Sequence, residues 1–202
     1  MNFVKIFNIL LYTNLSIFIH MWWTVILGVL VVVALFFITL YNGLVKLKLT
    51  VDEASADIET FLKQRYDMIP NLVEIVKGYA KHEREIFENV AELRTKAMGA
   101  GTLDEKMALE GELSKGIAKI FAIAEAYPEL KANTNFMQLQ SNLKELEDNI
   151  QKSRRFYNGT VRDFNTKIAI FPNNLLSGML GFKTMPFFEA SEEEQKNVEI
   201  KF

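Results

Sequence analysis

The sequence contains no cysteine among its 202 residues, and only two histidines and four prolines. The absence of cysteine excludes disulfide bonds, thiol catalysis and zinc held by thiolates. His82 is the only histidine after residue 41, whereas a di-iron centre in a helical bundle needs a Glu-x-x-His motif on each of two helices. We therefore expect no cofactor, no metal centre and no catalytic residue, and predict that the protein is not an enzyme.

Charged residues are missing from one long stretch, residues 22–41, which reads WWTVILGVLVVVALFFITLY. An α-helix of about 20 apolar residues spans a hydrocarbon core of about 30 Å. Trp22 and Trp23 lie at one edge of the stretch and Tyr41 at the other, where amphipathic rings favour the lipid headgroups. The stretch is therefore predicted to be a single transmembrane helix, which makes the lipid bilayer the first expected partner.

Residues 1–21 make the apolar region longer than one simple span, because only a histidine interrupts the uncharged run between Lys5 and Lys46. Three interpretations stay open: a variable extension, an interfacial helix, or part of a second short pass. We favour the extension, since Met21 adjoins the tryptophan pair and is a natural start. Lys46 and Lys48 then flank only the C-terminal end of the span, so the positive-inside rule predicts that the following domain lies in the cytoplasm.

Residues 42–188 have the apolar spacing of α-helices and no alternation typical of strands. A seam of apolar residues at spacings of three and four runs from Leu44 to Met68, and Arg65 is the only polar residue in it. No turn signal separates this seam from the membrane helix. Pro70 suits the first turn of a helix, so a second helix is predicted to begin there.

Further signals divide the remainder of the domain into two more helices. Gly99 and Gly101 end the second helix, and Thr102 with Glu105 has the form of a capping box at the start of the third. Short connections make neighbouring helices antiparallel. The predicted fold is therefore all-α, a single-pass transmembrane helix that continues into an antiparallel bundle of about four long helices. The fourth helix carries an apolar residue at every seventh position: Phe136, Leu143, Ile150, Tyr157, Phe164 and Phe171.

Residues 171–188 form an apolar segment that glycine and proline interrupt. Because the fourth helix returns toward the bilayer, this segment is expected either to cap the lower end of the bundle or to rest on the lipid surface, and both interpretations stay open. Residues 189–202 are charged and are predicted to be a C-terminal tail. The apolar side chains of the segment are Leu175, Leu176, Met179, Leu180, Phe182, Phe187 and Phe188.

Four polar residues are candidates for contacts with a protein partner: Lys63, Arg65, Asp67 and Asn71. They would crowd the membrane-distal corner between the first and second helices, where they could form a docking surface. The alternative is a structured corner, in which Asp67 caps the second helix and pairs with Arg65.

One short pattern occurs twice, as Tyr41-Asn42-Gly43 and as Tyr157-Asn158-Gly159. In the antiparallel topology both copies are expected toward the membrane-proximal end of the bundle, so Tyr41, Asn42, Tyr157 and Asn158 are candidates for packing there. The simpler alternative is that small residues at these positions permit close helix packing.

A set of motifs runs through residues 22–202. In order they read Tyr41-Asn42-Gly43-Leu44-Val45, Lys63-x-Arg65-x-Asp67-x-Ile69-Pro70-Asn71-Leu72-Val73, Val76-Lys77-Gly78-Tyr79-Ala80-x-His82-Glu83, Ala124-Glu125-x-Tyr127-Pro128-x-Leu130-Lys131-Ala132-Asn133, Phe136-x-x-Leu139-Gln140 and Arg155-x-Tyr157-Asn158-x-x-Val161, followed by Pro172, Gly181-Phe182 and Phe187-Phe188. Together these motifs resemble the LemA family. Residues 1–20 lie outside the resemblance, which supports their interpretation as an extension.

The resemblance implies an N-terminal membrane helix in the bacterial inner membrane and a helical-bundle domain on the cytoplasmic side. It implies no established catalytic activity. A relative serves magnetosome membranes and some members are encoded near membrane metalloproteases, so the partner that the resemblance suggests is a membrane protease system.

The expected function is that of a membrane-anchored interaction or adaptor protein with an unidentified protein partner. The alternative is a membrane-organising scaffold of the cell envelope that forms a homo-oligomer. The formal net charge of −2 argues against a nucleic-acid partner.

Overall fold

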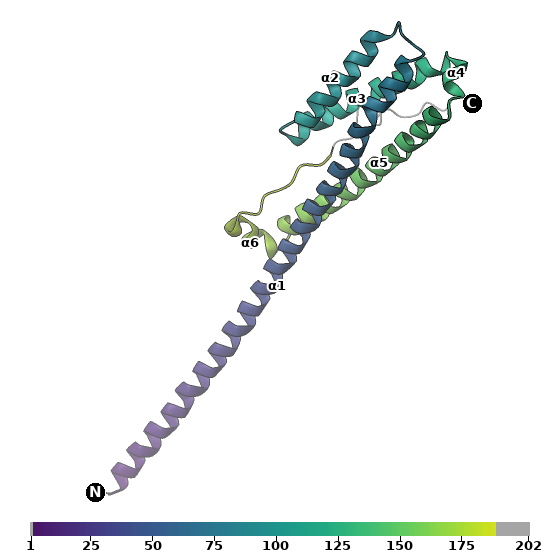
Figure 1. Cartoon of the computed structure of the whole chain (residues 1–202). Helices are drawn as coiled ribbons and strands as arrows, with labels where there is room; N and C mark the ends of the chain where they lie inside the picture. Colours follow the sequence, from purple (N-terminus) through teal and green to yellow (C-terminus); the bar gives the residue numbers. More distant parts are fainter. Residues whose placement is uncertain (1, 189–202) are drawn as a thin grey trace, which may run out of the picture.

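The computed structural model describes residues 2–188, which fold into helices without any strand (Figure 1). Four of the helices are long: α1 (Asn2–Lys77), α2 (Arg84–Gly99), α3 (Leu103–Glu125) and α5 (Thr134–Ala169). Two are short: α4 (Pro128–Lys131) and α6 (Asn173–Leu180). The predicted all-α fold is confirmed, and the predicted C-terminal tail lies outside the described residues.

Helix α1 is one continuous rod of 76 residues, which corresponds to roughly 114 Å at 1.5 Å per residue. Its lower half extends alone from the bundle (Figure 1). From His20 onward this helix is long and apolar enough to cross a membrane, with a mean hydropathy of 2.8 in its most apolar window and none of that window buried in the protein. Residues 2–21 belong to the same helix, so the described chain has no turn that a second short pass would require.

The prediction of a new helix at Pro70 is wrong, because α1 continues through this residue to Lys77. Proline lacks the N–H that would bond to the carbonyl four residues earlier, which here belongs to Tyr66. Arg94 of α2 replaces that donor, since its Nε lies 2.6 Å from the Tyr66 carbonyl oxygen. The chain reverses instead after Lys77, in the turn that leads to Arg84.

Helices α2 and α3 form a hairpin against the membrane-distal part of α1 (Figure 1). The predicted cap at the start of α3 is confirmed for Thr102, whose Oγ1 accepts from the Glu105 N–H at 3.2 Å. The Glu105 carboxylate accepts from the N–H of Gly101, one residue before the N-cap, at 3.3 Å. Near the same end of the hairpin, Lys106 Nζ forms an ion pair with Glu59 of α1 at 3.2 Å. The end of the hairpin therefore lies beside α1 near residues 56–60.

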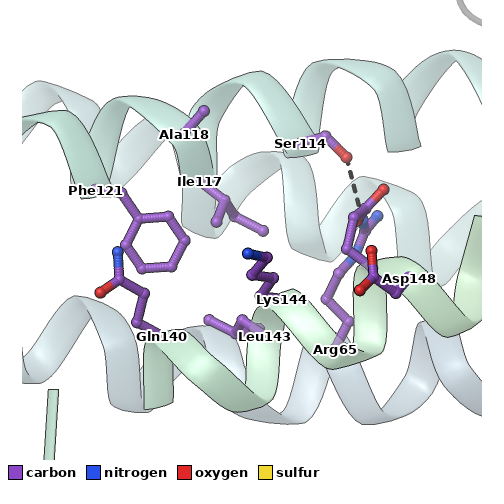
Figure 2. Close-up of a pocket in the computed structure, with 10 residues that line it drawn as sticks. Arg65, Ser114, Ile117, Ala118, Phe121, Gln140, Leu143, Lys144 and Asp148 are labelled. Atoms are coloured by element: carbon purple, nitrogen blue, oxygen red, sulfur yellow. Dashed lines mark hydrogen bonds and ion pairs between the residues drawn. The ribbon is translucent and has the colours of Figure 1, made fainter. Parts of the chain in front are cut away.

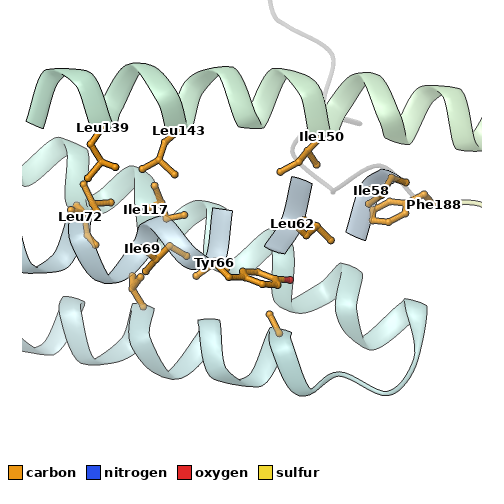
Figure 3. Packing of buried hydrophobic residues seen from close by; sticks show 14 of the residues in the cluster. Ile58, Leu62, Tyr66, Ile69, Leu72, Ile117, Leu139, Leu143, Ile150 and Phe188 are labelled. Carbon is orange, nitrogen blue, oxygen red and sulfur yellow. The ribbon is translucent and has the colours of Figure 1, made fainter. Parts of the chain in front are cut away.

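Helix α5 lies alongside α1 over most of the bundle and supplies one wall of the core (Figure 3). Its seven-residue apolar repeat is buried from Phe136 to Phe164. These side chains meet the apolar face of α1, which contributes Ile58, Leu62 and Leu72. The strict spacing on both helices keeps the two apolar stripes facing one another along their length.

After α5 the chain turns through α6 and then runs back along the bundle as an extended strap, residues 181–188. Gly181 ends α6 with a left-handed backbone, at φ +75°. The strap begins beside Tyr41, whose ring centroid lies 6.3 Å from that of Phe182, and it ends at the buried Phe188. The segment thus divides: its strap caps the bundle, whereas the apolar side chains of α6 at residues 175, 179 and 180 point outward.

Candidate partner-binding site

The most unusual chemical feature of the bundle is a buried charged cluster centred on Arg65 of α1. The side chain is 1% exposed, and its Nη1 donates to Glu147 Oε2 of α5 at 2.7 Å and to Ser114 Oγ of α3 at 3.1 Å. Its Nη2 forms an ion pair with Glu110 Oε2 of α3. One guanidinium therefore connects three helices, as its planar fork of donors allows.

Glu110 is fully buried and has a second partner, because the Tyr66 hydroxyl donates to its Oε1. Burial lowers the pKa of the Arg65 guanidinium, and the Glu147 carboxylate acts in the opposite direction. Burial likewise raises the pKa of the Tyr66 phenol. The arrangement is a buried ion-pair network that joins three helices of the core. Each charge in it is paired, since an isolated buried charge would be strongly unfavourable.

A groove with a volume of about 390 Å³ opens between α3 and α5 beside this cluster (Figure 2). Ile117 and Phe121 of α3 and Leu143 of α5 give it apolar walls. The guanidinium of Arg65 and the side chain of Ser114 lie toward one end of the groove, close to Glu147 and Asp148. Ala118, Gln140 and Lys144 complete the lining and are accessible from solvent.

The placement of the predicted docking corner is wrong, because Lys63, Arg65, Asp67 and Asn71 all lie within α1 and not at a turn. Lys63 and Asp67 are exposed and pair with each other at 3.5 Å, and Asn71 is also exposed. Arg65 points into the core and pairs with Glu110 and Glu147, so it is not available as part of an open corner. The error follows from placing the helix boundary at Pro70.

The two copies of the Tyr-Asn-Gly pattern have different surroundings. Tyr41 contacts Phe182, and Asn42 beside it is exposed. Tyr157 is buried, donates its hydroxyl to the Pro186 carbonyl at 3.1 Å, and has its pKa raised by burial and by the negative charge of Asp52. The contact between Arg65 and Glu147 sets the register of α1 and α5, which places Tyr157 about 20 Å along the bundle from Tyr41.

Asn158 has a specific role that the sequence pattern did not reveal, which is to hold the strap. Its Oδ1 accepts from the Phe188 N–H at 2.7 Å, and its Nδ2 donates to the Phe188 carbonyl at 2.8 Å. The ring of Phe188 packs edge-on against Tyr157 and lies under the guanidinium of Arg154 at 4.6 Å. Together these contacts fasten the end of the strap to α5.

Trp22 and Trp23, the predicted interface residues, are both exposed on α1. Trp22 packs edge-on against Phe18, with 5.8 Å between the ring centroids. Their position at a lipid headgroup layer stays a prediction.

Sequence reasoning missed Glu110 and the groove. A signal for Glu110 exists, because it precedes Leu113, Ile117, Ile120 and Ala124 at the spacing of the buried face of α3. An acidic residue in one apolar seam and Arg65 in another are typical of an ion pair between two helices. Among the described residues, no group of three or more His, Cys, Asp or Glu side chains is arranged to hold a metal ion.

The fold and this site define a class, a membrane-associated helical bundle on one long apolar helix. A family model described as LemA family matches residues 54–202, and the chain belongs to that family. The chain is 25% identical over 193 residues to magnetosome protein MamQ 2 of Paramagnetospirillum magneticum, which covers 81% of this chain and 71% of that protein. It is 27% identical over 162 residues to protein LemA of Metamycoplasma hominis, which covers 78% of this chain and 73% of that protein.

Proposed function

We propose that this protein is a membrane-anchored interaction module that has no catalytic activity of its own and that binds a protein partner in the groove between α3 and α5. The observation that carries the proposal is the groove, which combines apolar walls with an acidic end on a rigid bundle. The unbroken helix α1 would hold this bundle at a constant distance from the bilayer.

The chemistry of the groove indicates the kind of partner that fits. Ile117, Phe121 and Leu143 would receive apolar side chains of the partner. Two cations, Arg65 and Lys144, stand here against three carboxylates, so that end of the groove has an excess of one negative charge. The carboxylates are those of Glu110, Glu147 and Asp148. An amphipathic helix with apolar anchors and a Lys or Arg near one end would match both features.

Photo-crosslinking in native membranes tests this proposal. A photoreactive residue at Ala118 or Gln140, both in the groove, is expected to give a discrete product with another protein. The same residue at Glu88, exposed on α2, serves as the control and is expected to give none. Mass spectrometry of the product should identify a segment with helical apolar spacing and a basic residue.

A matched pair of charge reversals tests the acidic end. Asp148→Lys should reduce the yield of the crosslinked product several-fold, whereas Asp57→Lys on the exposed face of α1 should leave it unchanged. Equal products from groove and control positions, or no product from the groove, would refute the proposal.

A scaffold that assembles with copies of itself is the second candidate, and it is supported by relatives that are named magnetosome proteins and match most of the chain. It predicts that the crosslinked product is a dimer of this chain. Size measurement of the protein in lipid nanodiscs separates the two functions, because the interaction module would be monomeric without its partner.

The cytoplasmic side of a bacterial inner membrane is the location that we infer from Lys46 and Lys48, which flank the apolar span. The chain has no native cysteine, so a cysteine introduced at Glu88 is a unique label site. A membrane-impermeant maleimide should label it only after the cells are opened. Labelling in intact cells would contradict this orientation.

A further inference from the structure

Helix α6 has its polarity reversed relative to a helix of a soluble protein. Asn173 and Ser177, one turn apart, are only 2% and 6% exposed, and the Ser177 hydroxyl donates to the Ile168 carbonyl at 3.1 Å. Leu175 and Met179, also one turn apart on the opposite face, are 62% and 84% exposed. The polar face thus packs against the bundle, and most of the surface of Leu175 and Met179 is exposed.

This apolar face continues beyond α6 itself. Leu180 at its end and Ile170 and Phe171 before it are also exposed. A cluster of this kind is unfavourable in water and marks a surface that another apolar phase covers.

The position of α6 identifies that phase. Phe182, the second residue of the strap after α6, contacts Tyr41, the last residue of the apolar span. Leu44, the first core residue of α1 after the span, lies only about 4.5 Å further along the helix. The headgroup layer is about 5 to 7 Å thick on each side of the hydrocarbon core, so a bilayer that holds residues 22–41 would reach the base of the bundle.

The charges around α6 fit a lipid surface as well. Residues 168–182 contain no acidic or basic residue. Lys167 and Lys183 border this uncharged segment, and Lys46 and Lys48 follow the span on α1. Lysines around an apolar face favour contact with anionic headgroups.

We propose that α6 is an interfacial helix, which inserts Leu175, Met179 and Leu180 into the bilayer surface beside the span and so gives the bundle a second membrane contact. Two contacts would restrict the tilt of the bundle relative to the membrane, which a single helix cannot do alone.

Spin labelling of the full-length protein in vesicles of phosphatidylcholine and phosphatidylglycerol tests the proposal. Because the chain lacks cysteine, single variants Met179→Cys, Leu30→Cys and Met98→Cys can each carry a nitroxide. Leu30 lies within the apolar span and provides the reference for a membrane position. Met98 is exposed near the end of α2 and provides the reference for water.

The readout is collision of the nitroxide with dissolved oxygen, which concentrates in lipid, and with a water-soluble nickel chelate. The label at residue 179 should favour oxygen over the chelate, as the label at residue 30 does. A ratio equal to that at residue 98 would overturn the proposal. Shielding from both reagents would also overturn it, because that result would mean that protein covers α6.

Discussion

Arg94 of α2 donates its Nε–H to the carbonyl oxygen of Tyr66 in α1, at a distance of 2.6 Å. That carbonyl is the one that Pro70 leaves without a helical donor, because proline has no N–H. A side chain from another helix therefore completes the hydrogen bonding of α1 and allows it to continue for two turns past the proline.

Loss of the Arg94 side-chain donor should destabilise the bundle. Arg94→Met keeps most of the aliphatic stem but leaves the Tyr66 carbonyl without its partner, which should cost about 1 to 3 kcal/mol of unfolding free energy. In a Pro70→Ala background the backbone N–H returns, so the same substitution should cost much less. Chemical denaturation, followed by circular dichroism, gives the free energies of unfolding for this double-mutant cycle. Additive effects of Arg94→Met and Pro70→Ala would contradict this account.

The buried pair of Arg65 and Glu110 should be costly to break and cheaper to replace. Glu110→Leu leaves the guanidinium with only Glu147 as a charged partner and should reduce the unfolding free energy by about 3 to 5 kcal/mol. The double variant Arg65→Met with Glu110→Leu removes both buried charges and should recover part of that loss. Chemical denaturation of the unchanged protein, the single variant and the double variant under the same conditions gives their free energies of unfolding. A double variant less stable than Glu110→Leu would refute the prediction.

The pH dependence of stability should include a contribution from Tyr66. Burial raises its pKa in the folded protein above the value of about 10 in an unfolded chain. The neutral phenol therefore contributes stability that is complete below pH of about 10 and is lost as the pH rises through the folded pKa. Tyr66→Phe should lose stability less steeply in this alkaline range than the unchanged protein, although it should be less stable near neutral pH, where Glu110 loses a donor.

Stability would be measured by denaturation at several pH values, with tyrosinate absorbance as a second readout. Equal slopes for Tyr66→Phe and the unchanged protein would exclude the contribution of the buried phenol.

Two glycines of α3 should respond oppositely to alanine. A Cβ at Gly116 would lie 2.7 Å from Cγ2 of the buried Val90 in α2, and the stiff χ1 of valine in a helix gives it little room to move. Gly116→Ala should therefore destabilise the α2–α3 hairpin by about 1 to 3 kcal/mol. At Gly111 a Cβ would meet nothing within 4 Å, so Gly111→Ala should stabilise the helix by up to about 1 kcal/mol. Thermal unfolding of both variants tests the contrast.

Periodicity predicted the helices well because each of their apolar stripes is local information. The repeat from Phe136 to Phe164 indicated α5, and the Thr102–Glu105 pair indicated the start of α3. The continuation of α1 past Pro70 could not be predicted in the same way. The donor that bonds to the Tyr66 carbonyl belongs to Arg94, which is distant in sequence.

The candidate site shows the same limit. Arg65 was visible in the sequence as the one polar residue of an apolar seam, but its partners Glu110 and Glu147 lie 45 and 82 positions away. The groove between α3 and α5 depends on how two helices diverge, and no single stretch of sequence records that angle.

By itself the sequence determined that residues 22–41 are an apolar helix without charge, that long helices with apolar stripes follow it, and that no thiol chemistry is available. These properties follow from composition and spacing along one segment at a time. Only the tertiary structure decided where α1 ends, which charges face inward, how Asn158 holds Phe188, and that α6 turns its polar side chains toward the bundle. Each of these features depends on contacts between segments that are distant in sequence. Such contacts contribute to the free energy of folding only when the segments pack together.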